Sequence, residues 1–110
     1  MTKRIQSAVS LEEAKRQLRV DHDEEDVYIE SLCLACTEMC EHEILRVIVG
    51  DSSEAVAASQ NEVPASIKAW ILLHVAELYR HREATTETEM KPLPHLGALL
   101  DRYRRWQGAL

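Results

Sequence analysis

The sequence predicts a mainly α-helical protein in which about four helices pack around one long helix at residues 64–83. Two observations favour this class. Apolar residues in the long segment recur at steps of three and four, the spacing that places them on one face of a helix. The chain also contains three glycines and three prolines among 110 residues, so few positions interrupt helices. A short strand is an alternative near residues 44–49.

The first helix is predicted at residues 10–19. Ser10 is an N-cap residue type, and Glu13 three positions later completes a capping box. An acidic segment, 21–26, follows this helix. It lacks the glycine and the final acid that a calcium-binding loop requires at fixed positions. We therefore interpret the segment as the cap and first turn of the next helix.

The second helix is predicted at residues 23–43. Its expected apolar side consists of Val27, Ile29, Leu32, Cys33, Cys36, Met39 and Cys40. Residues 44–49 either prolong this helix or form a short strand, because periodicity cannot distinguish the two in so short an apolar run. Residues 51–62 are predicted to form a surface loop with one helical turn at 54–58.

The long helix at 64–83 is apolar around most of its circumference, which predicts that other elements surround it. Trp70 and Leu73 are expected in the core. Residues 84–91 are predicted to be a loop, and a last amphipathic helix is predicted at 94–106. The whole chain, 1–110, is expected to form a single domain, with the helix at 94–106 as a candidate docking arm.

Charge and composition limit the function classes. The net charge of −6 argues against a general nucleic-acid binder, which is usually basic. The apolar run of the long helix is too short and too often interrupted by polar residues to span a bilayer. Residues 1–10 lack the apolar region of a signal peptide, and the three closely spaced cysteines do not indicate a secreted disulfide framework. The expected environment is a reducing cytoplasm.

Cys33, Cys36, Cys40 and His42 form a candidate metal cluster. Zinc requires four ligands in a tetrahedron, whereas three thiols along one helix face offer a pair of ligands but not easily three. We therefore interpret the cysteines as core residues. His74 is interpreted as a buried histidine with one hydrogen bond. No phosphate-binding loop, zinc-protease motif or nucleophile elbow is present, so we predict no catalytic, metal-binding or cofactor-binding residue and no enzyme.

The end of the chain, residues 101–106, mixes arginines with aromatic side chains. This composition is found in nucleic-acid patches and also in protein interfaces, where Arg, Tyr and Trp are enriched anchors. A basic helix C-terminus without a binding role is an equal alternative.

Several segments together carry a family resemblance. They are Ser10–Lys15, Leu18–Asp26, Val63–Ala69, Ile71–Val75, Tyr79–Ala84, Leu93–Pro94 and Leu99–Arg104. In order and spacing they resemble the small head–tail connector proteins of tailed phages and prophages. These are the adaptors placed between portal and tail, often labelled as DNA-packaging proteins. The resemblance covers most of the chain.

The resemblance implies a structural virion protein whose helical subunits form a ring, expected to be dodecameric on the portal. The ring would extend the DNA channel and bind a tail or stopper protein, with DNA only passing through. It further implies no catalysis, no cofactor and no membrane, with a location in the virion and in the host cytoplasm during assembly. The interface candidates are Tyr79, Arg82, Glu83, Arg102, Tyr103, Arg104, Arg105 and Trp106.

One rival hypothesis comes from a different class. The cysteine cluster and the arginine-rich end are also compatible with a small metal- or nucleic-acid-binding regulator encoded by a mobile element.

Overall fold

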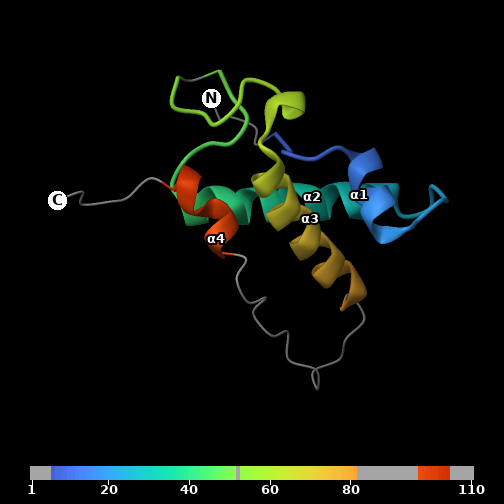
Figure 1. Cartoon of the computed structure of the whole chain (residues 1–110). Helices are drawn as coiled ribbons and strands as arrows, with labels where there is room; N and C mark the ends of the chain where they lie inside the picture. The colour runs from blue at the N-terminus through green and yellow to red at the C-terminus, as the bar shows by residue number, and fades with distance from the viewer. Residues whose placement is uncertain (1–5, 52, 82–96, 105–110) are drawn as a thin grey trace.

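The computed structural model describes residues 6–51, 53–81 and 97–104 (Figure 1). Within these ranges the α-helices are α1 (Leu11–Leu18), α2 (Asp26–Ile44), α3 (Ala65–Arg80) and α4 (Gly97–Leu100). Two short 3₁₀ helices complete the list, η1 (Gln60–Glu62) and η2 (Asp101–Tyr103). The predicted mainly helical class is confirmed, and no strand occurs among the described residues.

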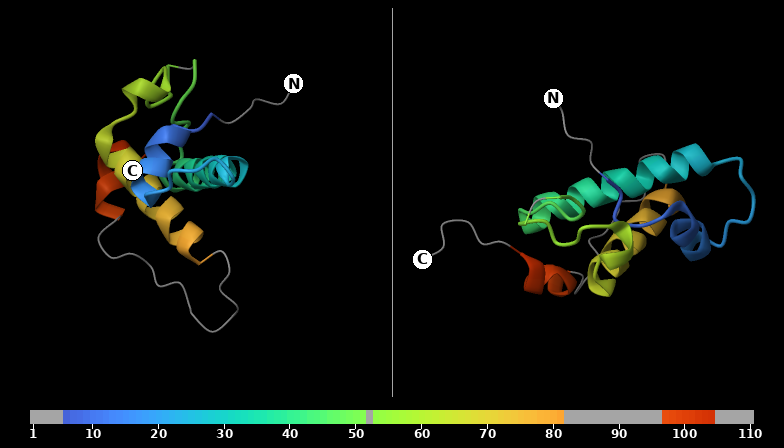
Figure 2. Two further views of the ribbon diagram at one scale, coloured as in Figure 1. Left: turned by 90° about the vertical axis from the view of Figure 1, so that its right-hand side faces the viewer. Right: turned by 90° about the horizontal axis from the view of Figure 1, so that it is seen from above.

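The helices form two layers. α2 makes up one layer, and α1, α3 and α4 lie on one side of it, as both views of Figure 2 show. α3 contacts each of the other three α-helices, which confirms its predicted central position. It crosses α2 obliquely (Figure 1), and the contact between these two helices is the most extensive in the fold.

α1 begins at the predicted capping box. The Glu13 amide donates to Ser10 Oγ at 3.0 Å, and the Ser10 amide donates to Glu13 Oε1 at 2.9 Å. The helix ends at Arg19, which adopts a left-handed backbone with φ of 60°. The amide of Val20 then donates to the Lys15 carbonyl at 2.9 Å, so carbonyls of the last turn are satisfied. Lys68 of α3 forms an ion pair with Glu13 at 2.9 Å and fixes α1 against α3.

α2 begins at Asp26, three residues later than predicted. The acidic segment before it forms a turn, in which the Asp26 amide donates to the Asp23 carbonyl at 3.3 Å. Lys15 of α1 holds this turn, because its ammonium lies 2.9 Å from the Asp23 carboxylate and 2.8 Å from the Asp26 carboxylate. A cation from the preceding helix therefore stabilises the acidic segment.

α2 ends at Ile44, because Leu45 adopts a left-handed backbone with φ of 60°. Residues 45–49 therefore neither prolong the helix nor form a regular strand; one isolated parallel bridge joins Val49 to Ala57. The Ala57 amide donates to the Ile48 carbonyl at 2.7 Å. The predicted helical turn at 54–58 is wrong, because this pairing holds the backbone near Ala57 in a bridge, and the helical turn forms later as η1.

α3 buries one side of its surface. Its buried residues are Ile67, Trp70, Ile71 and Val75. Trp70 is in the core as predicted, whereas Leu73 is 39% exposed, so its assignment to the core was wrong. Leu73 lies on the side of the helix opposite Ile71, two residues away, because successive positions on a helix rotate by about 100°. Residues 82–83, which were predicted to end this helix, lie outside the described residues.

The core also takes residues from α2, α4 and the segment before α1. In α2 the buried positions are Ile29, Cys33, Cys36, Thr37, Cys40 and Ile44. Thr37 accepts a hydrogen bond from the Ala8 amide at 3.1 Å, which ties the N-terminal segment to α2. Val27 and Met39 were predicted on the apolar side of α2, but they are 81% and 44% exposed.

The C-terminal helix is shorter than the predicted 94–106. It runs from Gly97 to Leu100 and continues as η2 to Tyr103, while residues 94–96 and 105–106 lie outside the described part of the chain. The loop predicted at 84–91 also lies outside it. Among the described helices, none combines the length and apolar character needed to cross a membrane.

Candidate assembly interface

The three cysteines are core residues, as predicted. Cys33 is 2% exposed, and Cys36 and Cys40 are fully buried. Burial raises the pKa of Cys33 to about 11 and the pKa values of Cys36 and Cys40 to about 12. No group of three potential metal ligands was found among the described residues. The thiols therefore act as small apolar side chains at the contact of α2 with its neighbours.

These thiols are expected to be inert in the folded protein. At pH 8 a thiol with a pKa of 11 or above contains almost no thiolate, and the thiolate is the reactive form. We expect no reaction with a thiol-specific chromogenic reagent under native conditions and reaction of all three cysteines in denaturant. Rapid labelling of the native protein would contradict the burial.

Because ionisation of these thiols favours the unfolded chain, stability should also fall as pH rises from about 9 towards 12.

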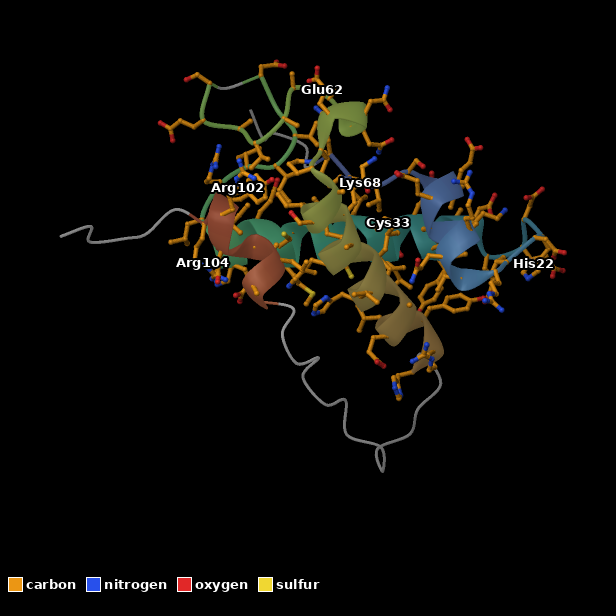
Figure 3. All side chains as sticks on the ribbon, in the orientation of Figure 1. His22, Cys33, Glu62, Lys68, Arg102 and Arg104 are labelled. Atoms are coloured by element: carbon orange, nitrogen blue, oxygen red, sulfur yellow. The ribbon has the colours of Figure 1, made fainter. Side chains whose placement is uncertain are left out.

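The arginines near the C-terminus differ in their roles (Figure 3). Arg104 donates from Nη1 to the Glu43 carbonyl at 3.0 Å and forms ion pairs with Glu43 and Asp101 at 3.5 and 3.6 Å. Arg46 donates from Nη1 to the Tyr103 carbonyl at 3.3 Å. Together they fasten η2 to the end of α2. Arg102 is exposed.

The remaining interface candidates lie near the end of α3. Tyr79 is half-buried; its hydroxyl donates to the Glu25 carboxylate, and its ring lies 6.3 Å from the ring of Tyr28. Arg82 and Glu83 lie outside the described residues, as do Arg105 and Trp106 at the C-terminus. Of the predicted set, Tyr103 and Arg104 are adjacent to Arg102, whereas Tyr79 lies at another place in the fold, beside the start of α2.

A surface hollow of about 570 Å³ lies between α2 and α3. Its lining is Glu38, Met39, His42, Glu43, Trp70 and His74. His74 stacks on Trp70 with ring centroids 3.9 Å apart, and its Nδ1 lies 2.8 Å from the Trp70 carbonyl oxygen. Since a carbonyl only accepts, Nδ1 is the donor in this hydrogen bond. His74 thus has the hydrogen bond predicted for it, but it is partly exposed, so its prediction as a buried histidine was wrong.

Comparison with known proteins identifies the family. A family model described as phage gp6-like head–tail connector protein matches residues 8–93. The chain belongs to this family of head–tail connectors. The crystal structure of bacteriophage HK97 gp6 has a similar fold, with a TM-score of 0.69 at 21% sequence identity. The match covers 89% of this chain and 94% of that one. No curated protein sequence matches the chain.

The connector is therefore a structural protein of phage assembly and a virion component. The family gives no support to the rival hypothesis of a metal- or nucleic-acid-binding regulator. The buried thiols also remove the main argument for a metal site.

One exposed face of this connector was not predicted from the sequence. Val27 and Leu34 of α2 are 81% and 42% exposed, although both are large apolar residues. They are seven residues apart, two helical turns, on the side of α2 opposite the cysteines. A second apolar spacing of seven, out of phase with the cysteine positions, was the available signal. Exposed apolar residues that line up on one face are typical of protein interfaces.

Electrostatics add to the character of this face. α2 contains five carboxylate residues and no lysine or arginine. One of the five, Asp26, is paired with Lys15, as is Asp23 in the preceding turn, and the hydrogen bonds to Asp26 and Asp23 raise the pKa of the Lys15 ammonium. Lys15 in turn lowers the pKa of Asp23. No cation of α2 itself accompanies the remaining acidic residues further along the helix.

Proposed function

We propose that this connector forms a closed ring on the portal, expected to hold twelve subunits, and that the ring extends the channel through which DNA passes. Its other rim is proposed to bind a tail or stopper protein, and assembly is proposed to take place in the host cytoplasm. The protein has no catalytic role in this proposal. The observation that carries it is membership of the head–tail connector family over residues 8–93.

The test is assembly with the portal protein of the same phage. Purified connector and portal are mixed, and the complexes are studied by negative-stain imaging and native mass spectrometry. We expect an added ring with the copy number of the portal. A connector that never associates with its portal, at any concentration tested, would contradict the proposal. The connector alone, tested by light scattering after size exclusion, shows whether the portal is needed as a template.

DNA binding by the isolated subunit is expected to be weak. Affinity for duplex DNA comes mainly from lysines and arginines that neutralise phosphates, whereas this chain has a net charge of −6. We expect a dissociation constant no tighter than about 10⁻⁴ M at physiological salt, the weak end for proteins that bind DNA non-specifically. Fluorescence anisotropy with a labelled duplex measures it. A sub-micromolar complex with a steep salt dependence would revive the regulator hypothesis. A weak interaction suits a channel in which DNA must slide.

The portal contact is proposed to include the exposed part of the C-terminal region. Arg102 is exposed beside half-buried Tyr103, and arginine and tyrosine are frequent anchors of interfaces. Arg102→Ala is expected to weaken portal binding without changing the melting temperature. The matched control is Gln17→Ala, which also shortens one exposed polar side chain but lies on α1. Equal binding by the wild type and Arg102→Ala would move the portal contact elsewhere.

A further inference from the structure

The outer face of α2 combines apolar residues with carboxylates. We define it as the exposed residues Val27, Glu30, Ser31, Leu34, Ala35 and Glu38. Leu34 lies one turn from Glu30 and one turn from Glu38, so an exposed leucine has a carboxylate on each side along the helix. Figure 2 shows that α1, α3 and α4 all lie on the other side of α2. The residues of this face are exposed in the described part of the subunit, and at its edge Glu30 and Leu34 line a surface hollow together with Ser7, Val9 and Gln60.

The opposite side of the molecule has the complementary character. The outer face of α3 is defined by exposed Ala65, Leu73 and Arg80. Leu73 is 39% exposed, and the Arg80 side chain is 70% exposed while contacting Glu77 at 3.5 Å. Arg16 on the neighbouring helix α1 and Arg19 at its C-cap are also exposed, together with one acid of α1, Glu12. Leu73 thus shares its face with the cationic Arg80, whereas Leu34 lies between two carboxylates.

We propose that the outer face of α2 in one copy of this chain binds the outer face of α3 in the next copy, with Leu34 against Leu73. This assignment rests on the proposed ring. A head-to-tail contact needs two different, complementary patches on each subunit, and it can repeat from copy to copy. These two faces meet that requirement, because α2 and α3 lie in different layers of the subunit (Figure 2), and Glu30 and Glu38 are exposed on α2 whereas Arg80 is exposed on α3. Complementary charge also fixes which faces meet and disfavours the pairing of two α2 faces.

Cysteine cross-linking between two single variants tests the contact. Leu34→Cys and Leu73→Cys are prepared separately, one with a mass tag, then mixed in equal amounts and oxidised. We expect the mixed dimer to exceed either homodimer severalfold. The native cysteines do not interfere, because all three are buried. The method also detects a weak or transient contact, so it does not require stable rings.

A matched control uses Glu62→Cys in η1, an exposed position just before α3 (Figure 3). Its cross-linking with each of the other variants gives the background from random encounters. A mixed Leu34→Cys and Leu73→Cys dimer no more abundant than this background would overturn the proposal. A dominant Leu34→Cys homodimer would overturn it as well, because it would show two α2 faces in contact.

Charge exchange gives a second, independent readout. Glu30→Lys with Glu38→Lys, introduced into the Leu34→Cys variant, should lower the mixed dimer about tenfold, since like charges then face each other. Arg16→Glu with Arg80→Glu in the Leu73→Cys variant should restore much of it. If neither charge change alters the yield of the mixed dimer, complementary charge does not select this contact, and the assignment of the two faces is wrong.

The two proposals fail in different ways. If rings form on the portal but the cross-links stay at background, the ring stands and the subunit contact lies elsewhere. If no ring forms with the portal, the proposed function fails, whatever the cross-links show.

Discussion

Replacing Ile71 by alanine is expected to destabilise the connector by about 2–5 kcal/mol, the range for a buried aliphatic side chain that leaves a cavity. Ile71 is fully buried on α3, the helix that contacts all other α-helices, so the cavity opens at the centre of the fold. Trp70→Ala should lie at the upper end of this range, since it removes a larger buried side chain. Urea denaturation followed by circular dichroism measures both changes.

Leu73→Ala on the same helix is the matched control. Its side chain is 39% exposed, so its removal should lower the stability by less than about 1 kcal/mol. Similar losses for Ile71→Ala and Leu73→Ala would mean that the described burial of α3 is wrong. If Leu73→Ala alone lowered the stability by the amount expected for Ile71→Ala, the face of α3 that carries Leu73 would be covered in the isolated protein.

Leu100→Ala is expected to destabilise the connector by about 2–5 kcal/mol as well. Leu100 is fully buried, and Arg104 beyond it is fastened to the Glu43 carbonyl at 3.0 Å. This end of the chain therefore contributes to the core, which limits the docking-arm prediction for 94–106 to its exposed residues. Thermal unfolding of the single variant measures the contribution without removing the segment.

Truncation after Lys91 extends the same test. The shortened chain lacks Leu100 and Arg104, so we expect it to lose its cooperative melt. Arg102→Ala is the control, because its side chain is exposed and its loss should leave the melt unchanged. A truncated protein that melts cooperatively at the wild-type temperature would show that the segment is a separable arm after all.

Local chemistry made the helices predictable. The Ser10 and Glu13 capping box specifies the start of α1 by itself, and the structure has both of its hydrogen bonds. The cysteines were placed in the core because their spacing follows one helix face, and they are buried. Trp70 and the central position of α3 followed from apolar periodicity in the same way.

Features that depend on distant residues were not predictable in this way. α2 begins late because Lys15, on another helix, holds the acidic turn at Asp23. The bridge between Val49 and Ala57 replaces the helical turn expected at 54–58, and a pairing of this kind has no local signature. Val27 was predicted on the apolar side of the second helix, but it faces away from the neighbouring helices and is 81% exposed.

The interface candidates show the same difference between features that local sequence predicts and features that depend on distant residues. Composition selected the arginines of the C-terminal region, but it did not distinguish Arg104, which binds Glu43 within the subunit, from exposed Arg102. The exposed leucine of α2 was missed, because the sequence does not say which apolar residues remain without a partner. A fold is needed to separate residues that hold a subunit together from residues that are available to another one.

The oblique crossing of α3 over α2 determines the symmetry that the proposed contact permits (Figure 1). Within each subunit, the axis of α3 is turned relative to the axis of α2. The contact between α3 and the next α2 adds a second turn, and the two together set the orientation of one subunit relative to the next. A closed ring requires that neighbouring copies be related by a pure rotation about one axis, without translation along it, so the crossing of α3 on the next α2 must be compatible with that rotation. Side chains at the contact, Leu34 and Leu73 above all, set that second angle by the way their ridges interdigitate. Changes in their shape would therefore convert a planar ring into an open spiral, while each subunit remains folded as before.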